Sequence, residues 1–358
     1  MSDAQKWLVL AFILFIGWLI YLLAPILMPF AFAAILAYLG DPLADRLEVI
    51  KIKQFQLGRT GAVVVVFTLM LIIISIVLTI LIPKIEFQIS QFLSQLPSYA
   101  KWLNQTVIPW IELQSGIEIS HIEGNKITAL VKGHWQKAGQ SAMTLMGSVS
   151  RSSMVVAEVI MNLILIPVIT FYLLRDWDIL VEKVHNLLPR RAAPTAEKLA
   201  AETNIVLGAF MRGQFYVMLA LGIIYSVGLW LVDLNLALLI GMLAGLVSFV
   251  PYLGSIVGIT IACIAALLQF QDPVYLIPVS MVFIVGQSME GMVLTPWLVG
   301  DKIGLHPVAV MFSVLAGGQL FGFLGILLAL PFASVIMVLL RHIHEIYRDS
   351  DFYCVKND

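Results

Sequence analysis

The chain has 358 residues, of which 60% are apolar and 12% charged, and its formal charge at neutral pH is -1. Soluble globular domains are roughly 45–50% apolar and about 25% charged, so this composition excludes an ordinary water-soluble fold and favours the lipid bilayer as solvent. No basic domain is present for binding nucleic acid, and the two cysteines, Cys263 and Cys354, are too few for a disulfide scaffold.

Long apolar stretches alternate with polar connections along the chain. Of 43 charged residues (21 basic and 22 acidic), only Glu158 and Arg212 fall inside these stretches. In hydrocarbon every backbone polar group needs a partner within the protein, so unbroken apolar runs predict helices. The sequence therefore predicts an all-α, polytopic helical membrane protein, with spans at 7–39, 61–82, 152–174, 205–232, 234–271, 273–289 and 303–340.

Three of these stretches are too long for a single crossing. They hold 33, 38 and 38 residues, whereas about 20 helical residues cross a bilayer core about 30 Å thick. Each contains helix breakers near its middle, which predicts broken or re-entrant helical hairpins; kinks or packing faces are the alternative. The breakers are Pro25 and Pro29 in 7–39, Pro251 to Gly254 in 234–271, and Gly317, Gly318, Gly322 and Gly325 in 303–340.

Lysine and arginine in the connections predict the orientation and the division into parts. Residues 40–60, 175–204 and the tail after 340 carry lysine and arginine, which predicts that these connections and both termini lie in the cytoplasm. Segment 83–151 carries amphipathic helical stripes and is expected to lie outside the membrane, either as a lid or surface helix or as a hairpin packed on its own bundle. The parts are then 1–82 with an N-terminal hairpin, 83–151, and a transport core at 152–358 that includes cytoplasmic helices at 175–204.

The sequence contains no catalytic or nucleotide-binding motif. A nucleophile elbow, a P-loop, a metalloprotease zinc motif and a dinucleotide fingerprint are all missing. We therefore expect neither an enzyme nor an ATP-driven pump, and we expect no cofactor and no metal site.

Ionisable residues within spans are costly and are default functional candidates. We expect Arg212, next to Gln214, and Glu290, one turn after Gln287, to pair at the inner mouth of a pathway. The alternative is that each charge snorkels separately to the interface. Glu158, with Asn162 one turn deeper, is a candidate proton or ion site, although an interfacial position without function is the other interpretation.

Several segments together resemble the autoinducer-2 exporter family of bacterial inner-membrane permeases, and within it the PerM-type permeases. They span most of the chain, and the most specific is 287–307 with its continuation to Pro331, where E-G, P-x-x-x-G, L-H-P, G-G and F-G-x-x-G follow in order. The other segments are PFAFAAILAYLGDP at 29–42, TFYLLRDWDILVEKVHNLLPRR at 170–191, RGQ at 212–214 and SFVPYLGS at 248–255.

The resemblance implies an oligomeric secondary transporter or exporter in the bacterial inner membrane. Members have been linked to efflux of autoinducer-2, and some relatives to sodium(lithium)/proton antiport. The predicted spans do not place Glu158 or Glu290 near the midplane of the bilayer. Because a cation antiporter needs carboxylates embedded in the membrane, the residue chemistry favours solute transport over antiport. The positions that match the family are Arg212, Pro251, Gly254, Gln287, Glu290, Pro296, Gly300, His306, Pro307, Gly318 and Gly325.

The sequence thus favours a permease that moves a small solute by alternating access, with 234–271 and 303–340 lining the path. Residues Pro251, Gly254, His306, Gly318 and Gln319 join Arg212, Gln214, Gln287 and Glu290 as pathway candidates. The expected partners are membrane lipid, a small-molecule substrate and further copies of the chain, for instance a pentamer, with no nucleic acid. A non-transporting membrane scaffold is the alternative from another class.

Overall fold

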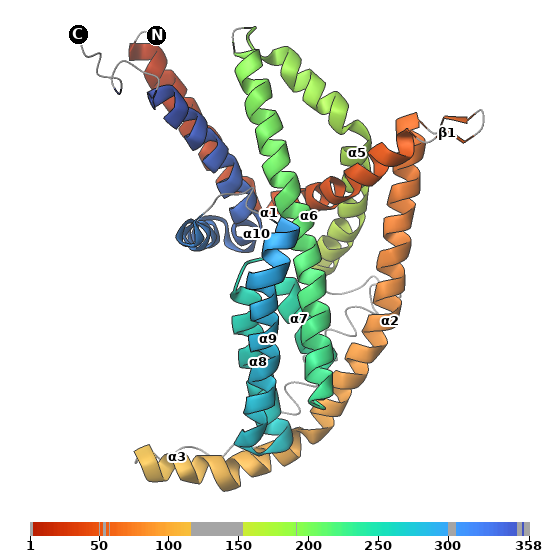
Figure 1. Cartoon of the computed structure of the whole chain (residues 1–358), viewed down its shortest axis with the longest axis vertical. Coiled ribbons are helices and arrows are strands. Elements are labelled where there is room, and N and C mark those ends of the chain that lie inside the picture. The colour runs from red at the N-terminus through yellow and green to blue at the C-terminus, as the bar shows by residue number, and fades with distance from the viewer. Residues whose placement is uncertain are drawn as a thin grey trace. The chain divides into compact units, whose positions relative to one another are not determined.

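A computed structural model describes residues 3–49, 51–52, 55–56, 58–115, 153–190, 192–299, 306–348 and 353. Nearly all of them are helical, which confirms the predicted all-α class (Figure 1). The one described strand pair joins two residues each, β1 (Lys51–Ile52) and β2 (Phe55–Gln56), in antiparallel register. The helices are α1 (Asp3–Glu48), α2 (Gly58–Trp102), η1 (Leu103–Val107), α3 (Ile108–Ser115), α5 (Ser153–Leu187), α6 (Ala193–Leu231), α7 (Ala237–Val247), α8 (Leu253–Phe270), η2 (Pro273–Tyr275), α9 (Leu276–Met289), η3 (Glu290–Val299) and α10 (Pro307–Arg348).

Six helices within the described residues are long and apolar enough to cross a membrane. Each overlaps one of the predicted spans, and the remaining span, 152–174, lies in α5. The polytopic prediction is thereby confirmed. The six candidate spans are Ile26–Glu48, Gly58–Gln114, Ala193–Leu231, Leu253–Phe270, Pro273–Leu298 and Val308–Arg348.

The first two long helices pass through their prolines. The backbone of α1 is helical at Pro25 and Pro29, where the sequence analysis expected a turn, and α2 continues through Pro83 and Pro97. Neighbouring groups in a membrane helix can satisfy the carbonyl that proline leaves free, so proline there kinks a helix more often than it ends it. The boundary expected after residue 82 therefore falls inside α2. The stretch 116–151 lies outside the described residues, and the extramembrane position of 83–151 stays a prediction.

The chain divides into two compact units, which are described separately. Unit 1 comprises Met1–Leu71, Asn162–Gln214 and Pro296–Asp358, and unit 2 comprises Ile72–Met161 and Phe215–Thr295.

An arginine binds the helix ends of unit 1 together. Arg59, at the start of α2, forms ion pairs with Asp41 (2.6 Å) and Asp45 on α1, and it donates to the carbonyl of Leu174 on α5 at 3.0 Å. Lys198 of α6 lies 3.9 Å from Glu345 of α10. Arg59 thus joins the 40–60 connection to the end of the 152–174 span, and Lys198 joins the 175–204 connection to the tail after 340.

The last long helix, α10, consists of two arms. Its backbone breaks at Gly322, where φ is 58° and ψ is -137°, a conformation open mainly to glycine (Figure 1). The arms then approach so closely that a Cβ on Gly317 would lie 2.9 Å from the backbone carbon of Gly325. A break in 303–340, as the glycines predicted, is therefore present, and it lies at Gly322.

The second predicted hairpin, in 234–271, forms α7 and α8 of unit 2. Its turn is at 248–252, and Tyr252 begins α8 from a left-handed conformation with φ of 66°. At 1.5 Å per residue the 11 residues of α7 extend about 16 Å, roughly half of the bilayer core, so this arm is too short to span. The arm also packs against α6, where a Cβ on Gly245 would lie 2.6 Å from the amide nitrogen of Gly222.

Candidate functional site

The α7–α8 turn places two of the predicted pathway residues. Pro251 lies in the turn and Gly254 in the first turn of α8. A Cβ on Gly254 would overlap the Ser248 hydroxyl and the Ala244 carbonyl, and that hydroxyl donates to the same carbonyl at 2.8 Å. Gly254 is thus required for the close return of the chain, which is a structural reason for its presence whatever the function.

A buried polar cluster lies where α9 passes into the π-helix η3. Glu290 is the first residue of η3 and is only 5% exposed. The amide nitrogen of Gln287 donates to Glu290 Oε2 at 3.2 Å, as their one-turn spacing predicts. The other amide atom, Gln287 Oε1, is buried without a hydrogen-bond partner. π-Helical turns often mark functional sites, because they realign side chains along a helix.

Tyr225 of α6 completes this cluster and was missed by the sequence analysis. Its side chain is fully buried, it stacks on Phe283 with ring centroids 4.7 Å apart, and its hydroxyl has no hydrogen-bond partner. The Tyr225 ring packs against α9 one turn before Glu290, because a Cβ on Gly286 would lie 2.9 Å from the Cζ atom of the ring. A tyrosine in the middle of an apolar span was the available signal, since a buried phenol usually needs a partner.

A cavity of about 710 Å³ with both polar and apolar lining residues lies elsewhere in unit 2. Lys84, Gln88 and Gln91 of α2 face Trp230 and Asn235 across it, with Ser226 and Asp233 also in the lining. The Gln88 side-chain oxygen accepts from the backbone nitrogen of Leu239 at 3.1 Å and so satisfies one free donor near the start of α7. Cavities of this size suit small-molecule ligands.

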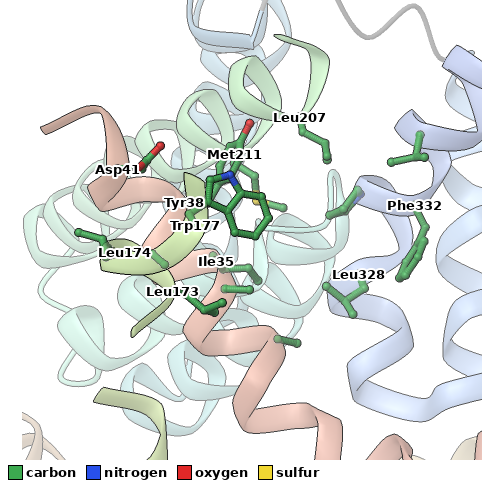
Figure 2. A pocket seen from close by; sticks show the side chains of 15 residues that line it. Ile35, Tyr38, Asp41, Leu173, Leu174, Trp177, Leu207, Met211, Leu328 and Phe332 are labelled. Carbon is green, nitrogen blue, oxygen red and sulfur yellow. The ribbon is translucent and has the colours of Figure 1, made fainter. Parts of the chain in front are cut away.

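An apolar cavity of about 340 Å³ lies in unit 1 (Figure 2). Its lining comes largely from segments 29–42 and 170–191, which helped to carry the family resemblance. Tyr38 and Trp177 lie on one side and Leu328 and Phe332 of α10 on the other. The Tyr38 hydroxyl donates to the backbone carbonyl of Asn204 at 2.9 Å, so the polar groups are confined to one end of the cavity.

Arg212 and Glu290 fall in different units, and their pairing stays a prediction. In unit 1 the guanidinium of Arg212 is exposed and its charge acts on the Tyr38 hydroxyl. A Cβ on Gly208 would lie 2.8 Å from Arg212 Nη2, so this glycine leaves room for the arginine one turn later. Gln214 is buried at 4% exposure.

The other predicted site residues are dispersed over unit 1 and α5. The imidazole of His306 accepts from the backbone nitrogen of Val308 at 3.3 Å and caps α10, while Gln319 is exposed on the first arm of that helix, next to Gly318. Glu158 and Asn162 belong to α5, but their side chains lie outside the described residues, as does Gly300. The role of these residues is therefore still a prediction.

A family model described as AI-2E family transporter matches residues 10–345. The chain belongs to this family. It is 24% identical to YueF of Bacillus subtilis (strain 168), over 91% of this chain and 84% of YueF, and the name of that protein gives transport as its expected role.

Two further relatives extend the comparison. PerM of Escherichia coli (strain K12), whose name gives permease as its expected role, is 28% identical over 56% of this chain, and the match spans 58% of PerM. A protein of Halobacillus andaensis named sodium-lithium/proton antiporter is 22% identical over 86% of this chain and 87% of its own length. The family resemblance seen in the sequence is confirmed, and the names point to transport and not to catalysis.

Proposed function

We propose that this membrane protein is a secondary transporter that moves a small, hydroxylated solute across the bacterial inner membrane. Autoinducer-2, after which the family is named, is the first candidate. The observation that carries the proposal is the unit 2 cavity, where amide, ammonium and carboxylate side chains line a space between otherwise apolar helices. Hydroxyl groups need donors and acceptors of this kind, and Trp230 adds an aromatic face for the carbon skeleton.

Alternating access is the mechanism that we propose. Both helical hairpins interrupt the regular backbone, at Tyr252 in unit 2 and at Gly322 in unit 1. Interrupted helices in transporters mark substrate paths and can move as arms about their breaks. Cytoplasmic termini and a homo-oligomeric assembly are part of this proposal. The glycines of α7 pack against α6 of the same chain, so they are not free to form contacts between subunits. We propose that other surfaces form those contacts.

Flux of labelled autoinducer-2 into and out of proteoliposomes tests the solute. The variant Lys84→Met removes an ammonium from the cavity lining, and Lys101→Met on the same helix removes one outside it. We expect the first variant to raise the half-saturating concentration about tenfold, which corresponds to loss of roughly one charged hydrogen bond, and the second to leave it unchanged. Equal behaviour of both variants, or no flux by the unmodified protein, would refute the proposal.

Sodium(lithium)/proton antiport is a second candidate. It is favoured by one observation, a carboxylate buried among apolar helices at Glu290, and by the name of the Halobacillus andaensis relative. Proteoliposomes loaded with a pH-sensitive dye would show proton movement on addition of sodium or lithium ions. Movement without any added organic solute would select antiport.

A further inference from the structure

The Glu290 cluster combines one carboxylate with polar atoms that lack partners. Both Gln287 Oε1 and the Tyr225 hydroxyl are buried without a hydrogen bond, and the Tyr225 side chain is completely inaccessible. A buried polar group that stays unsatisfied destabilises the fold, so two of them in one cluster need an explanation. A proton bound to the Glu290 carboxyl group would provide such an explanation.

The described helices of unit 2 around Glu290 supply no positive charge. None of the ion pairs among the described residues includes Glu290. The elements of unit 2 around it, which are α7, α8, α9, η3 and the part of α6 from Phe215 to Leu231, contain no lysine, arginine, histidine or second acidic residue. Tyr225 of α6 packs against α9 at Gly286, one turn before Glu290, while Tyr216 lies further along α6 and Cys263 lies on α8.

An isolated ionised carboxylate is very costly in such a setting, and the usual remedy is that it takes up a proton. A protonated Glu290 carries an O–H group, which can donate to Oε1 of Gln287, the side chain that already contacts this carboxyl group. The proton thus removes the buried charge and at the same time satisfies an acceptor that is otherwise free. The ionised state has only the Gln287 amide nitrogen as a described donor.

A metal ion fits this cluster less well than a proton. Cations held by oxygen take about six ligands, whereas the cluster offers the side-chain oxygens of three residues. The described residues also include no group of three or more histidine, cysteine, aspartate or glutamate side chains that could hold a metal.

We propose that Glu290 is the proton-binding site through which a proton gradient drives transport, with Tyr225 and Gln287 as positioning residues. This inference rests on the proposed transport function. The proton is bound when the cluster is closed to water, as described here, and leaves the carboxyl oxygen when a conformational change brings the carboxylate into contact with water. One proton is carried for each cycle of opening and closing.

Infrared spectroscopy tests proton binding without reference to any solute. The protein in lipid vesicles is titrated from about pH 5 to about pH 9, above the ordinary glutamate range, and a protonated carboxyl band is assigned by labelling glutamate with carbon-13. We expect the band in the unmodified protein, its loss in Glu290→Gln, and its persistence in Glu86→Gln, which changes an exposed carboxylate of α2. Tyr225→Phe keeps the ring but removes the hydroxyl, and we expect the band to shift.

Flux measurements then separate this inference from the function on which it rests. With autoinducer-2 as the probe, an imposed proton gradient should accelerate flux in the unmodified protein severalfold, whereas Glu290→Gln should exchange solute at a rate that the gradient does not change. A band with no flux refutes the proposed solute but leaves the proton site in place. Gradient-driven flux that persists in Glu290→Gln overturns the proton site.

Arg212 provides a further way to refute the proposal. If Arg212 pairs with Glu290, as the sequence analysis expected, the carboxyl group is ionised in the unmodified protein and no band is seen. The band would then appear only in Arg212→Ala. That result would make Glu290 the partner of an arginine and not a proton carrier.

Discussion

The packing of Tyr225 against α9 can be tested with a single methyl group. A Cβ added at Gly286 would overlap the Tyr225 ring, whose Cζ atom would lie 2.9 Å away, and the ring is stacked on Phe283 and cannot retreat freely. Overpacking of this kind costs about 1–3 kcal/mol. The better helix propensity of alanine returns up to about 1 kcal/mol. We therefore expect Gly286→Ala to lower the free energy of unfolding by about 1–2 kcal/mol.

The free energy of unfolding is measured by equilibrium unfolding in mixed detergent micelles. A substitution at Gly291, five residues away, is the matched control. A Cβ on Gly291 would meet no atom within 4 Å, so Gly291→Ala should be neutral or slightly stabilising. In a protein that already carries Tyr225→Ala, the methyl group added at position 286 has room. The loss of unfolding free energy caused by Gly286→Ala should then be smaller by at least about 1 kcal/mol, as a double-mutant cycle would show. Equal effects of Gly286→Ala and Gly291→Ala, or a cost that the background does not change, would refute the close contact between α6 and α9.

Three further changes test unit 1. Arg59→Ala should lower the free energy of unfolding by about 2–3 kcal/mol, because several carboxylates lose a shared partner. Arg59→Lys should recover only part of the lost stability, since the point charge of lysine cannot replace the forked guanidinium group. Gly325→Ala should prevent the α10 arms from meeting and reduce the folded yield sharply, whereas Gly318→Ala, which meets only a flexible side chain at 3.1 Å, should be tolerated. The guanidinium of Arg175 holds the pKa of Asp176 below its ordinary value, so the ion pair stabilises the fold above about pH 4 and this stabilisation is lost as the pH falls further. The melting temperature of Asp176→Asn should therefore fall less between pH 7 and pH 3 than that of the unmodified protein.

The helical class and two of the three helix breaks could be predicted because they depend on local chemistry. Backbone satisfaction in lipid requires helices, and the runs around Pro251 and Gly322 interrupt apolar stretches that are too long for one crossing. The turn predicted at Pro25 and Pro29 was wrong, because the backbone there is helical. Proline removes one donor but does not by itself reverse a chain, whereas Gly322 adopts a backbone conformation that other residues avoid.

The site was less predictable because it depends on contacts between distant segments. The spacing of Gln287 and Glu290 predicted their hydrogen bond, since residues three apart share a helix face. Tyr225 lies 65 positions from Glu290, and although a tyrosine within an apolar span is a signal, it does not show which distant residues the ring contacts. The cavity lined by Lys84 and Trp230 likewise joins parts of the chain that no periodicity connects.

Packing around Phe283 gives a physical route from the Glu290 cluster to the α7–α8 hairpin. The Phe283 ring stacks on Tyr225 on one side, and on the other a Cβ at Gly258 of α8 would lie 2.6 Å from its Cε1 atom. Well-packed interiors do not deform continuously, so a shift of the Tyr225 ring would displace Phe283 and with it α8. Movement in the Glu290 cluster that reaches Tyr225 would therefore be transmitted to the hairpin that is interrupted at Tyr252, which is the element that we expect to move during transport.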